Sequence, residues 1–315
     1  MLWIVPSDQY LLIPDTPHPA AAAVQVPKEK PDGNGGGIYY LDVKERPARQ
    51  LEVDFPGLAP DGSDFVPASA VQPPGANESE AHQFDLEQMA TSQQIAAAVA
   101  LKQLGYKVKV SANGALILAT GPGTPANGKL VPGDVIVSVD GHPVRTTDRA
   151  RELLRRHRPG DVVEIGLRNR NGLRTVKLKT IPDPQNPSIP IVGVLLEQAA
   201  SIKLPFPVSI DTGNIGGPSA GLPFALEVMQ KLGKDVDRGY KVAATGEIFL
   251  DGAIGPIGGV RQKIFGARQA GVDIMLVPAG DNAAIARRYA GHVRVIAVKS
   301  FRQALRALAT LPPKR

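Results

Sequence analysis

Two side chains in the last third of the sequence could together perform acyl transfer. Ser219 lies in Gly217-Pro218-Ser219-Ala220-Gly221, and Lys263 follows the pair Gly258-Gly259. A serine hydroxyl is a weak nucleophile until a neighbouring base removes its proton, and a lysine becomes such a base when burial strips its charge. The small residues around both positions allow the backbone to approach closely. The pattern predicts a Ser219–Lys263 dyad.

Each of these residues also has an ordinary structural interpretation. Ser219 precedes the apolar spacing of a helix and could simply cap it, and a lysine on a helix is usually exposed to solvent. The apolar neighbours Val260 and Ile264 place Lys263 on the inward half of its own helix. The catalytic interpretation therefore depends on the two residues occurring together.

The other parts of a serine hydrolase can be sought nearby. A helix N-terminus favours developing negative charge, so we expect the amides of Ser219 and Gly216 to hold an oxyanion, since Pro218 has no N–H. Thr245 stands at the end of an expected strand and could orient the lysine amine. Glu247, two residues later, is a conspicuous strand-end acid to which the sequence assigns no role.

Two further motifs compete with this interpretation. Gly217-x-Ser219-x-Gly221 also fits the nucleophile elbow of α/β-hydrolases, and Asp273 and His292 follow it in the required order, so an esterase stays open as an alternative. Gly123-x-x-x-x-Gly128-Lys129 is similar to a phosphate loop. However, Leu130 stands where a serine or threonine must bind magnesium, so we expect no nucleotide there.

The composition is that of an ordinary globular protein. The 315 residues, 43% of them hydrophobic, carry a net charge of +6 and suffice for two domains. The absence of cysteine excludes disulfides, thiolate catalysis and cysteine metal sites. The five histidines are scattered, so we expect no metal and no other cofactor. The arginine-rich segments 149–158 and 168–174 lack aromatic residues for base stacking, and a nucleic-acid partner is not expected.

Changes in composition divide the chain into four parts. Residues 1–35 are rich in proline and alanine and begin with five apolar residues, which suggests a leader or the stub of an anchor. Residues 36–106 include a strand at 38–43, a long loop over 54–77 and a helix over 78–104. Residues 107–181 form a β-rich block, and residues 182–315 begin with a proline-rich linker.

Strands and helices alternate from the linker to the end of the sequence, which is typical of an α/β layer. The expected strands are 206–211, 241–248, 273–277 and 293–298, and the expected helices are 219–232, 260–270, 282–290 and 301–310.

The motifs of this last part resemble the proteolytic domain of the Lon family. They are Gly217-Pro218-Ser219-Ala220-Gly221, Thr245-Gly246-Glu247-Ile248, Gly258-Gly259 with Lys263, and Pro278 followed by Asn282, in the family's order and at nearly its spacing. The resemblance implies that Ser219 is the nucleophile, Lys263 the base and Thr245 the residue that steers Lys263. The ATPase module of Lon has no counterpart here, and histidines often found before the serine in Lon are missing from 205–211.

The middle block resembles a PDZ domain. The similarity lies in Ala115-Leu116-Ile117-Leu118, in Pro125-Ala126, and in the run from Lys129 to Ile136 with Val139-Asp140-Gly141. PDZ domains bind the C-terminal ends of peptides as an added strand. We expect the loop that holds the peptide carboxylate at Asn113, Gly114, Ala115 and Leu116.

The whole chain therefore resembles the bacterial PDZ-containing Lon-like proteins. The resemblance implies an α/β (α+β) Lon-type proteolytic domain with an inserted, mainly β PDZ domain. It implies an ATP-independent serine endopeptidase that acts on unstructured or exposed polypeptide segments, with the PDZ domain recruiting or gating them. It also implies an N-terminal membrane anchor facing out of the cell, and suggests a hexameric ring as the homo-oligomer. A latent protease domain serving as a peptide-binding scaffold is the alternative from another class.

Overall fold

The computed structural model describes residues 6–30, 35–71, 78–169 and 172–314. Contacts divide the chain into two compact units. The first unit comprises residues 1–72, 81–108 and 204–315, and the second comprises residues 73–80 and 109–203. The second unit thus interrupts the first in sequence. It also extends to Lys203, well beyond the boundary expected at 181.

The first unit is built on a five-stranded sheet of order β2-β4-β16-β19-β20. Its strands are β2 (His18–Pro19), β4 (Gly37–Tyr40), β16 (Lys241–Ala244), β19 (Ile274–Pro278) and β20 (Arg294–Val298). The last four run parallel, and β2 pairs antiparallel with β4 at the edge. The strand expected at 38–43 therefore joins the sheet of the C-terminal part.

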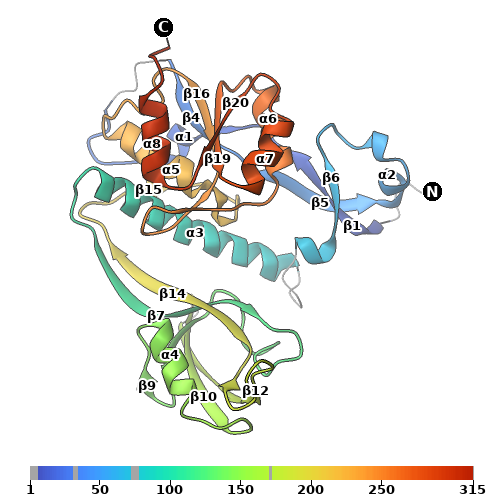
Figure 1. The fold of residues 1–315 in the computed structure, drawn as a ribbon, viewed down its shortest axis with the longest axis vertical. Helices are drawn as coiled ribbons and strands as arrows, with labels where there is room; N and C mark the ends of the chain where they lie inside the picture. The colour runs from blue at the N-terminus through green and yellow to red at the C-terminus, as the bar shows by residue number, and fades with distance from the viewer. Residues whose placement is uncertain (1–5, 31–34, 72–77, 170–171, 315) are drawn as a thin grey trace. The chain divides into compact units, whose positions relative to one another are not determined.

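Helices cover both faces of this sheet (Figure 1). Alternate strand residues divide between two cores, with Val242 and Leu276 in one and Ala243 and Met275 in the other. The first core packs against helices α1 (Ala20–Ala23), α3 (Glu78–Gln103), α5 (Gly221–Lys231) and α8 (Phe301–Ala309). The second packs against α6 (Val260–Gln269) and α7 (Asp281–Arg288). The α/β layer expected from the sequence is confirmed as three layers.

A second, three-stranded sheet of order β5-β1-β6 belongs to the same unit. Its strands are β1 (Pro6–Pro14), β5 (Val43–Arg49) and β6 (Asp64–Pro67), with the short helix α2 (Gln50–Asp54) after β5. Turns of 3₁₀ helix occupy Pro56–Leu58 and Ala68–Ala70.

The N-terminal sequence was thus interpreted wrongly in two places. Residues 6–14 are a paired strand rather than a leader, and the expected loop over 54–77 contains β6. The apolar segment 1–5 lies outside the described residues. Among the helices that the structure describes, none is long and apolar enough to cross a bilayer.

The second unit is a sheet of order β11-β10-β8-β7-β14 with β9 beside β8. The helix α4 (Thr147–Leu154) packs on it through Ala150, Leu153 and Leu154. The strands are β7 (Lys109–Thr120), β8 (Val135–Val139), β9 (His142–Pro143), β10 (Val162–Asn169), β11 (Gly172–Lys179) and β14 (Val194–Lys203). The edge strand β14 pairs with β7 along its whole length and was not foreseen from the sequence.

Several short strands differ from the expected elements. Only Ser209–Ile210 (β15) of the expected strand 206–211 is paired, with β3 (Val24–Gln25). The expected strand 241–248 ends at Ala244, after which β17 (Glu247–Ile248) turns aside to pair with β18 (Ile254–Gly255). The proline-rich linker contains the pair β12 (Ile181–Pro182) and β13 (Pro190–Ile191).

Candidate active site

The two predicted catalytic side chains meet at the carboxyl end of β16. Ser219 lies in a 3₁₀ turn, Pro218–Ala220, that leads into α5, whereas Lys263 is on α6. These helices cover opposite faces of the sheet. Side chains from both layers can therefore touch only where the strand between them stops, which is the edge at which α/β sheets commonly hold their ligands.

The lysine amine is within hydrogen-bonding distance of the serine hydroxyl. Lys263 Nζ lies 2.7 Å from Ser219 Oγ. The lysine is 4% exposed, whereas the serine is partly open to solvent. This arrangement gives a shielded base beside an accessible hydroxyl, which nucleophilic catalysis by serine requires.

Burial changes the protonation of this lysine. Loss of solvent lowers the pKa of Lys263 to about 8, although the negative charges of Asp42 and Glu45 oppose the effect. An ammonium without water or a hydrogen-bonded carboxylate is costly to maintain, so the neutral amine gains in population. Near pH 8, a large share of the molecules carry an amine that can accept the serine proton.

Thr245 holds the amine from a third direction. Its Oγ1 lies 3.2 Å from Lys263 Nζ and donates to the carbonyl of Ser219 at 3.3 Å. Thr245 is fully buried, directly after the last residue of β16. The hydroxyl thus contacts both members of the pair without adding a charge that would keep the lysine protonated.

Backbone contacts fix the turn that carries Ser219. The carbonyl of Ser219 accepts from the N–H of Gly246 at 2.7 Å, and Leu222 N–H donates to the carbonyl of Gly246 at 3.0 Å. Gly217 has φ of +86°, a conformation that a residue with a Cβ rarely adopts. The N–H of Gly217 donates to the carbonyl of Asp85 on α3 at 2.8 Å, so it is already engaged.

The other motif residues lie around the pair in supporting positions. Gly216 directly precedes the turn and packs against Asp85. Glu247 lies on β17, two residues after Thr245, and pairs with Gly255 of β18. Asn282, at the start of α7, uses its amide to accept from the N–H of Ile257 and to donate to the carbonyl of Ile257, both at 2.9 Å. Asn282 thereby fixes the loop before the lysine helix.

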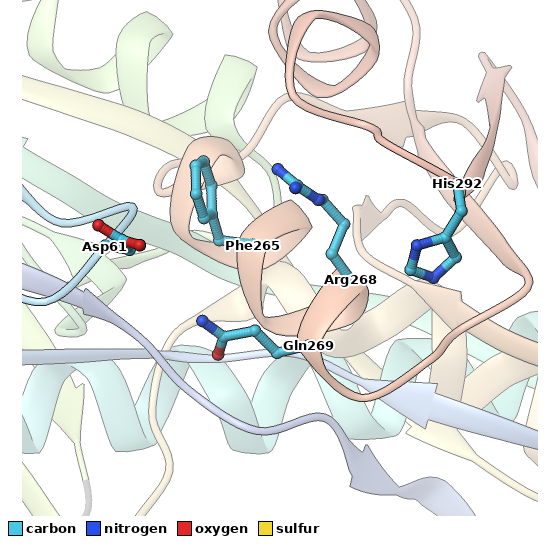
Figure 2. Close-up of a pocket in the computed structure, with 5 residues that line it drawn as sticks. All are labelled: Asp61, Phe265, Arg268, Gln269 and His292. Carbon is cyan, nitrogen blue, oxygen red and sulfur yellow. The ribbon is translucent and has the colours of Figure 1, made fainter.

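The esterase alternative places its residues elsewhere. His292 lines an open pocket with Asp61, Phe265, Arg268 and Gln269 on the outer side of α6 (Figure 2). The carboxylate of Asp273 instead accepts from the backbone of Lys241 at 2.8 Å and from Lys314 Nζ at 2.6 Å. Within the described chain, no hydrogen bond joins Ser219, His292 and Asp273. The Ser-His-Asp interpretation is therefore wrong.

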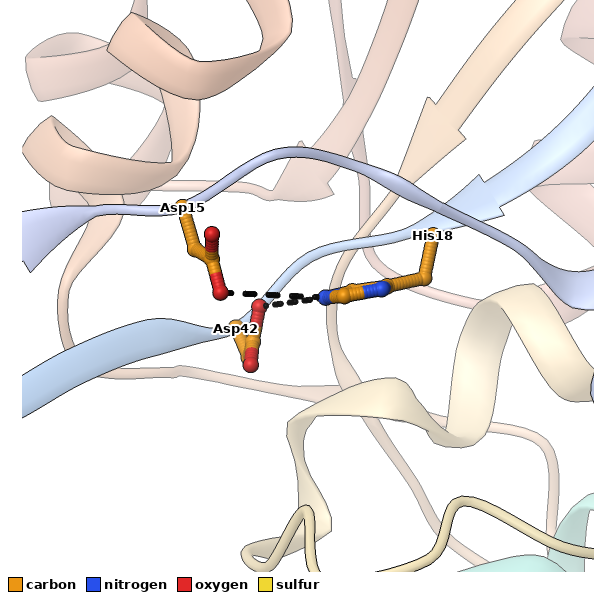
Figure 3. Close-up of side chains that lie close together, drawn as sticks. All are labelled: Asp15, His18 and Asp42. Atoms are coloured by element: carbon orange, nitrogen blue, oxygen red, sulfur yellow. Dashed lines mark hydrogen bonds and ion pairs between the residues drawn. The ribbon is translucent and has the colours of Figure 1, made fainter.

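Among the described residues, one group could offer three ligand atoms to a metal ion. It comprises Asp15, His18 and Asp42 (Figure 3). His18 Nε2 lies 3.1 Å from Asp42 Oδ1, and Lys44 Nζ lies 2.6 Å from Asp15 Oδ1. Both carboxylates thus already have cationic or hydrogen-bonding partners, and nothing in this geometry calls for a metal. Asp42 matters for another reason, because its charge raises the pKa of Lys263.

The residues expected to hold a peptide carboxylate have no free backbone edge. Asn113, Gly114, Ala115 and Leu116 belong to β7. Ala115 and Leu116 pair with β14 on one side and with β8 on the other. An added strand therefore finds no free backbone at Ala115 and Leu116, and the location of the peptide site stays a prediction. The two edge strands of this sheet are β14, beside β7, and β11, beside β10.

Several residues near the site were missed in the sequence. They are Asp42 in the link between β4 and β5, Glu45 on β5, and Asp85 and Ser92 on α3, all far from Ser219 in the chain. Each is an isolated acid or serine without a motif around it. Only the fold, which brings residues 42–45 and α3 beside the last third of the chain, reveals them.

Comparison with known families agrees with the two units. Residues 207–310 match the Lon protease (S16) C-terminal proteolytic domain, and residues 102–180 match the PDZ domain. "Lon protease 2" of Bacillus subtilis is 38% identical over 99 residues, which are 31% of this chain and 18% of that protein. "Lon protease 2" of Herpetosiphon aurantiacus is 50% identical over 62 residues, which are 20% of this chain and 8% of that protein. The chain thus spans less than a fifth of the length of these relatives.

Solved PDZ domains are also similar. The PDZ domain of an SdrC-like protein from Listeria monocytogenes is 22% identical with a TM-score of 0.26, covering 28% of this chain and 92% of that one. The corresponding domain from Listeria innocua is 24% identical with a TM-score of 0.25, covering 27% and 96%. By the two family matches alone, the chain carries a Lon-type proteolytic domain at residues 207–310 and a PDZ domain at residues 102–180.

Proposed function

We propose that this protein is an ATP-independent serine endopeptidase with a Ser219–Lys263 dyad. The observation that carries the proposal is the 2.7 Å contact between Lys263 Nζ and Ser219 Oγ, made by an amine that is 4% exposed. Burial holds the pKa of this amine near 8, the range in which a general base works at physiological pH.

The reaction follows from this geometry. Neutral Lys263 accepts the proton of Ser219 as the oxygen attacks a peptide carbonyl. The resulting ammonium then donates that proton to the leaving amine, which departs and leaves an acyl-serine. Water, deprotonated by the same lysine, hydrolyses the ester and restores the pair. Thr245 keeps the amine aimed at Ser219 throughout, because its hydroxyl reaches Nζ and the Ser219 carbonyl together.

The oxyanion of the tetrahedral intermediate needs backbone donors. The N–H of Gly217 is engaged by Asp85, and Pro218 has none. The amides of Gly216 and Ser219 remain as the donors of the nucleophile turn. They flank the point where the attacked carbonyl must lie if it is to meet Ser219 Oγ.

The substrates are flexible polypeptides. Segment 121–130, whose spacing is similar to a phosphate loop, forms consecutive turns with no helix after them, so it lacks the helix N-terminus on which such loops hold phosphate. Cleavage without an ATP-driven unfolding step restricts the enzyme to unstructured segments and exposed chain ends.

The PDZ unit would select such segments by their C-terminal ends. Of its two edge strands, β14 and β11, we assign the peptide to β14 because α4 contacts this strand. A peptide added to β14 would gain main-chain hydrogen bonds on one side and side-chain contacts with the helix on the other. Leu195, which is 58% exposed on this strand, is available to such a ligand.

Cleavage of casein and labelling by an active-site serine phosphonate test the proposal together. The wild-type protein should cleave casein without ATP and acquire the phosphonate at Ser219, as located by mass spectrometry. Ser219→Ala and Lys263→Ala should each reduce cleavage by at least about 1,000-fold, because neither residue attacks or activates alone. An unlabelled wild-type protein that still binds C-terminal peptides would instead identify a peptide-binding scaffold.

A further inference from the structure

Helix α3 lies outside both matched segments except for its last two residues, yet it contacts the turn that carries Ser219. It spans Glu78–Gln103, whereas the matches cover 102–180 and 207–310. Residues 81–108 belong to the same compact unit as the dyad. Side-chain and backbone contacts join this helix to the segment just before and around the nucleophile.

The most buried of these contacts is made by Ser92. Its Oγ donates to the carbonyl of Pro218 at 2.9 Å, and the residue is 3% exposed. Pro218 immediately precedes Ser219. A Cβ at Gly221, on the other side of the nucleophile, would lie 2.7 Å from Ser92 Oγ. The hydroxyl of Ser92 therefore fits between both ends of the turn.

Two further contacts lie on the N-terminal side of the turn. The carbonyl of Asp85 accepts from Gly217 N–H at 2.8 Å, and a Cβ at Gly216 would lie 2.6 Å from the Cβ of Asp85. Gln93 Nε2 donates to Thr212 Oγ1 at 3.2 Å. The helix thus contacts the approach to the nucleophile as well as the turn itself.

The turn needs such support because little within it resists movement. Gly216 and Gly217 have no side chains, Gly217 has positive φ, and Pro218 has no N–H to donate. On the sheet side, Gly246 and Thr245 hold the Ser219 carbonyl. On the opposite side, the contacts described above come from α3. A displacement of about 1 Å at a reacting atom can cost about 100-fold in rate.

We propose that Ser92 is a positioning residue for Ser219, and that α3 holds the nucleophile turn from the side opposite the sheet. The inference rests on the proposed endopeptidase function. Without the Ser92 hydroxyl, the Pro218 carbonyl keeps the N–H of Gly221 as a donor but loses the one that comes from α3, and the turn shifts or loosens. Ser219 Oγ then leaves the position in which Lys263 can take its proton.

Ser92→Ala tests this, with Thr91→Ala as the matched control because Thr91 is the exposed neighbour on the same helix. Ser92→Ala should lower kcat on an unstructured fluorogenic peptide, and the rate of phosphonate labelling at Ser219, by about tenfold, because the turn loses its hydrogen bond to α3. KM and the midpoint of the pH–rate profile should stay unchanged, since Ser92→Ala alters neither the substrate contacts nor the burial and the charges of Asp42 and Glu45 that set the pKa of Lys263. Thr91→Ala should match the wild type.

Two more variants separate positioning from a loss of folding. Ser92→Cys keeps a weaker donor of similar size and should recover part of the lost rate. Gln93→Ala removes the more peripheral contact, with Thr212, and should reduce the rate of phosphonate labelling by about threefold. This variant serves as the test if Ser92→Ala does not fold. All rates are measured well below the melting temperature of each variant.

The outcomes distinguish a failure of the proposed positioning role from a failure of the proposed endopeptidase function. Unchanged labelling and kcat in folded Ser92→Ala, or in Gln93→Ala where the former does not fold, would overturn the role of α3 and leave the endopeptidase intact. A loss confined to KM would also overturn it. A wild-type protein that neither cleaves nor is labelled at Ser219 would refute the proposed function and this inference with it.

Discussion

Each unit of the molecule buries an ionisable side chain, and the two are surrounded in opposite ways. Asp134, whose side chain is fully buried in the PDZ unit, contacts Arg174, accepts from Asn169 Nδ2 at 2.9 Å and accepts from Val131 N–H at 3.3 Å. The side-chain amine of Lys263, in the proteolytic unit, has two hydroxyl groups as its hydrogen-bonding partners among the described residues.

The difference in hydrogen-bonding partners distinguishes a buried charge that stabilises the fold, Asp134, from a buried amine that can lose its proton, Lys263. Asp134 has its charge balanced by Arg174 and accepts two further hydrogen bonds, which join β8 to the β10–β11 hairpin. The Lys263 amine donates to two hydroxyl groups, and no carboxylate of the described residues forms an ion pair with it, so its proton is held weakly. Burial by itself therefore does not identify a functional group. The identity of the contacting partners does.

The largest contrast should appear when each group is replaced by an apolar or truncated residue. Lys263→Met should reduce the peptidase activity by a factor of at least about 10,000, because the general base is lost. The same change should raise the free energy of unfolding at pH 7 by on the order of 2 kcal/mol, because a buried amine with a depressed pKa costs stability. Chemical denaturation beside casein cleavage measures both. A Lys263→Met protein with a lower free energy of unfolding than the wild type would contradict the conclusion that burial of this amine costs stability.

Asp134→Ala should behave in the opposite way. It leaves Arg174 and Asn169 without their shared partner and should destabilise the PDZ unit by about 3–5 kcal/mol. Phosphonate labelling of Ser219 in the same preparation should persist as long as the proteolytic unit stays folded. Hydrogen exchange resolved by peptide would show the loss of protection in β8, β10 and β11. Protection equal to wild type there would mean that Asp134 is no structural anchor.

The pH dependence gives a smaller but more specific effect. Because the neutral amine is the base, kcat should rise with pH through a midpoint near 8, the pKa of Lys263. The unfolded chain binds this proton up to its ordinary pKa of 10.5, so the contribution of Lys263 to stability also rises with pH between about 8 and 10.5.

Asp42→Asn refines this expectation. Removing a negative charge that favours the ammonium should move the midpoint of the kcat profile to lower pH. Glu152→Gln, which removes an exposed acid on α4 in the PDZ unit, should leave the midpoint in place. A shift to higher pH in Asp42→Asn would show that Asp42 acts on the dyad by another route.

The sequence predicted the parts of the site that share local motifs. Ser219, Thr245 and Lys263 each lie within a short glycine-containing segment, and the periodic apolar residues after them predicted α5 and α6 correctly. The meeting of these segments at the end of β16 follows from the alternation of strands and helices. The contact between Ser219 and Lys263 was therefore predictable from the sequence.

The parts that were missed depend on contacts between distant segments. β1 contains two prolines, and its polar and apolar residues do not alternate regularly. Its local sequence therefore looks like an irregular segment, and only its pairing with β5 and β6 makes it a strand. β14 follows a proline-rich stretch and is defined by its pairing with β7. The contacts of α3 with the nucleophile turn involve Ser92, whose neighbours in sequence give no sign of it.

The division of the proteolytic unit into three stretches of chain has a consequence for its biosynthesis. Residues 1–72 and 81–108 leave the ribosome before the PDZ unit, whereas Ser219 and Lys263 follow it. A nascent chain can therefore complete its peptide-binding module while it still lacks both reactive side chains. Under the proposed function, hydrolytic competence would arise only when the last stretch closes the sheet begun by β4, and a molecule still being translated could not cleave its neighbours.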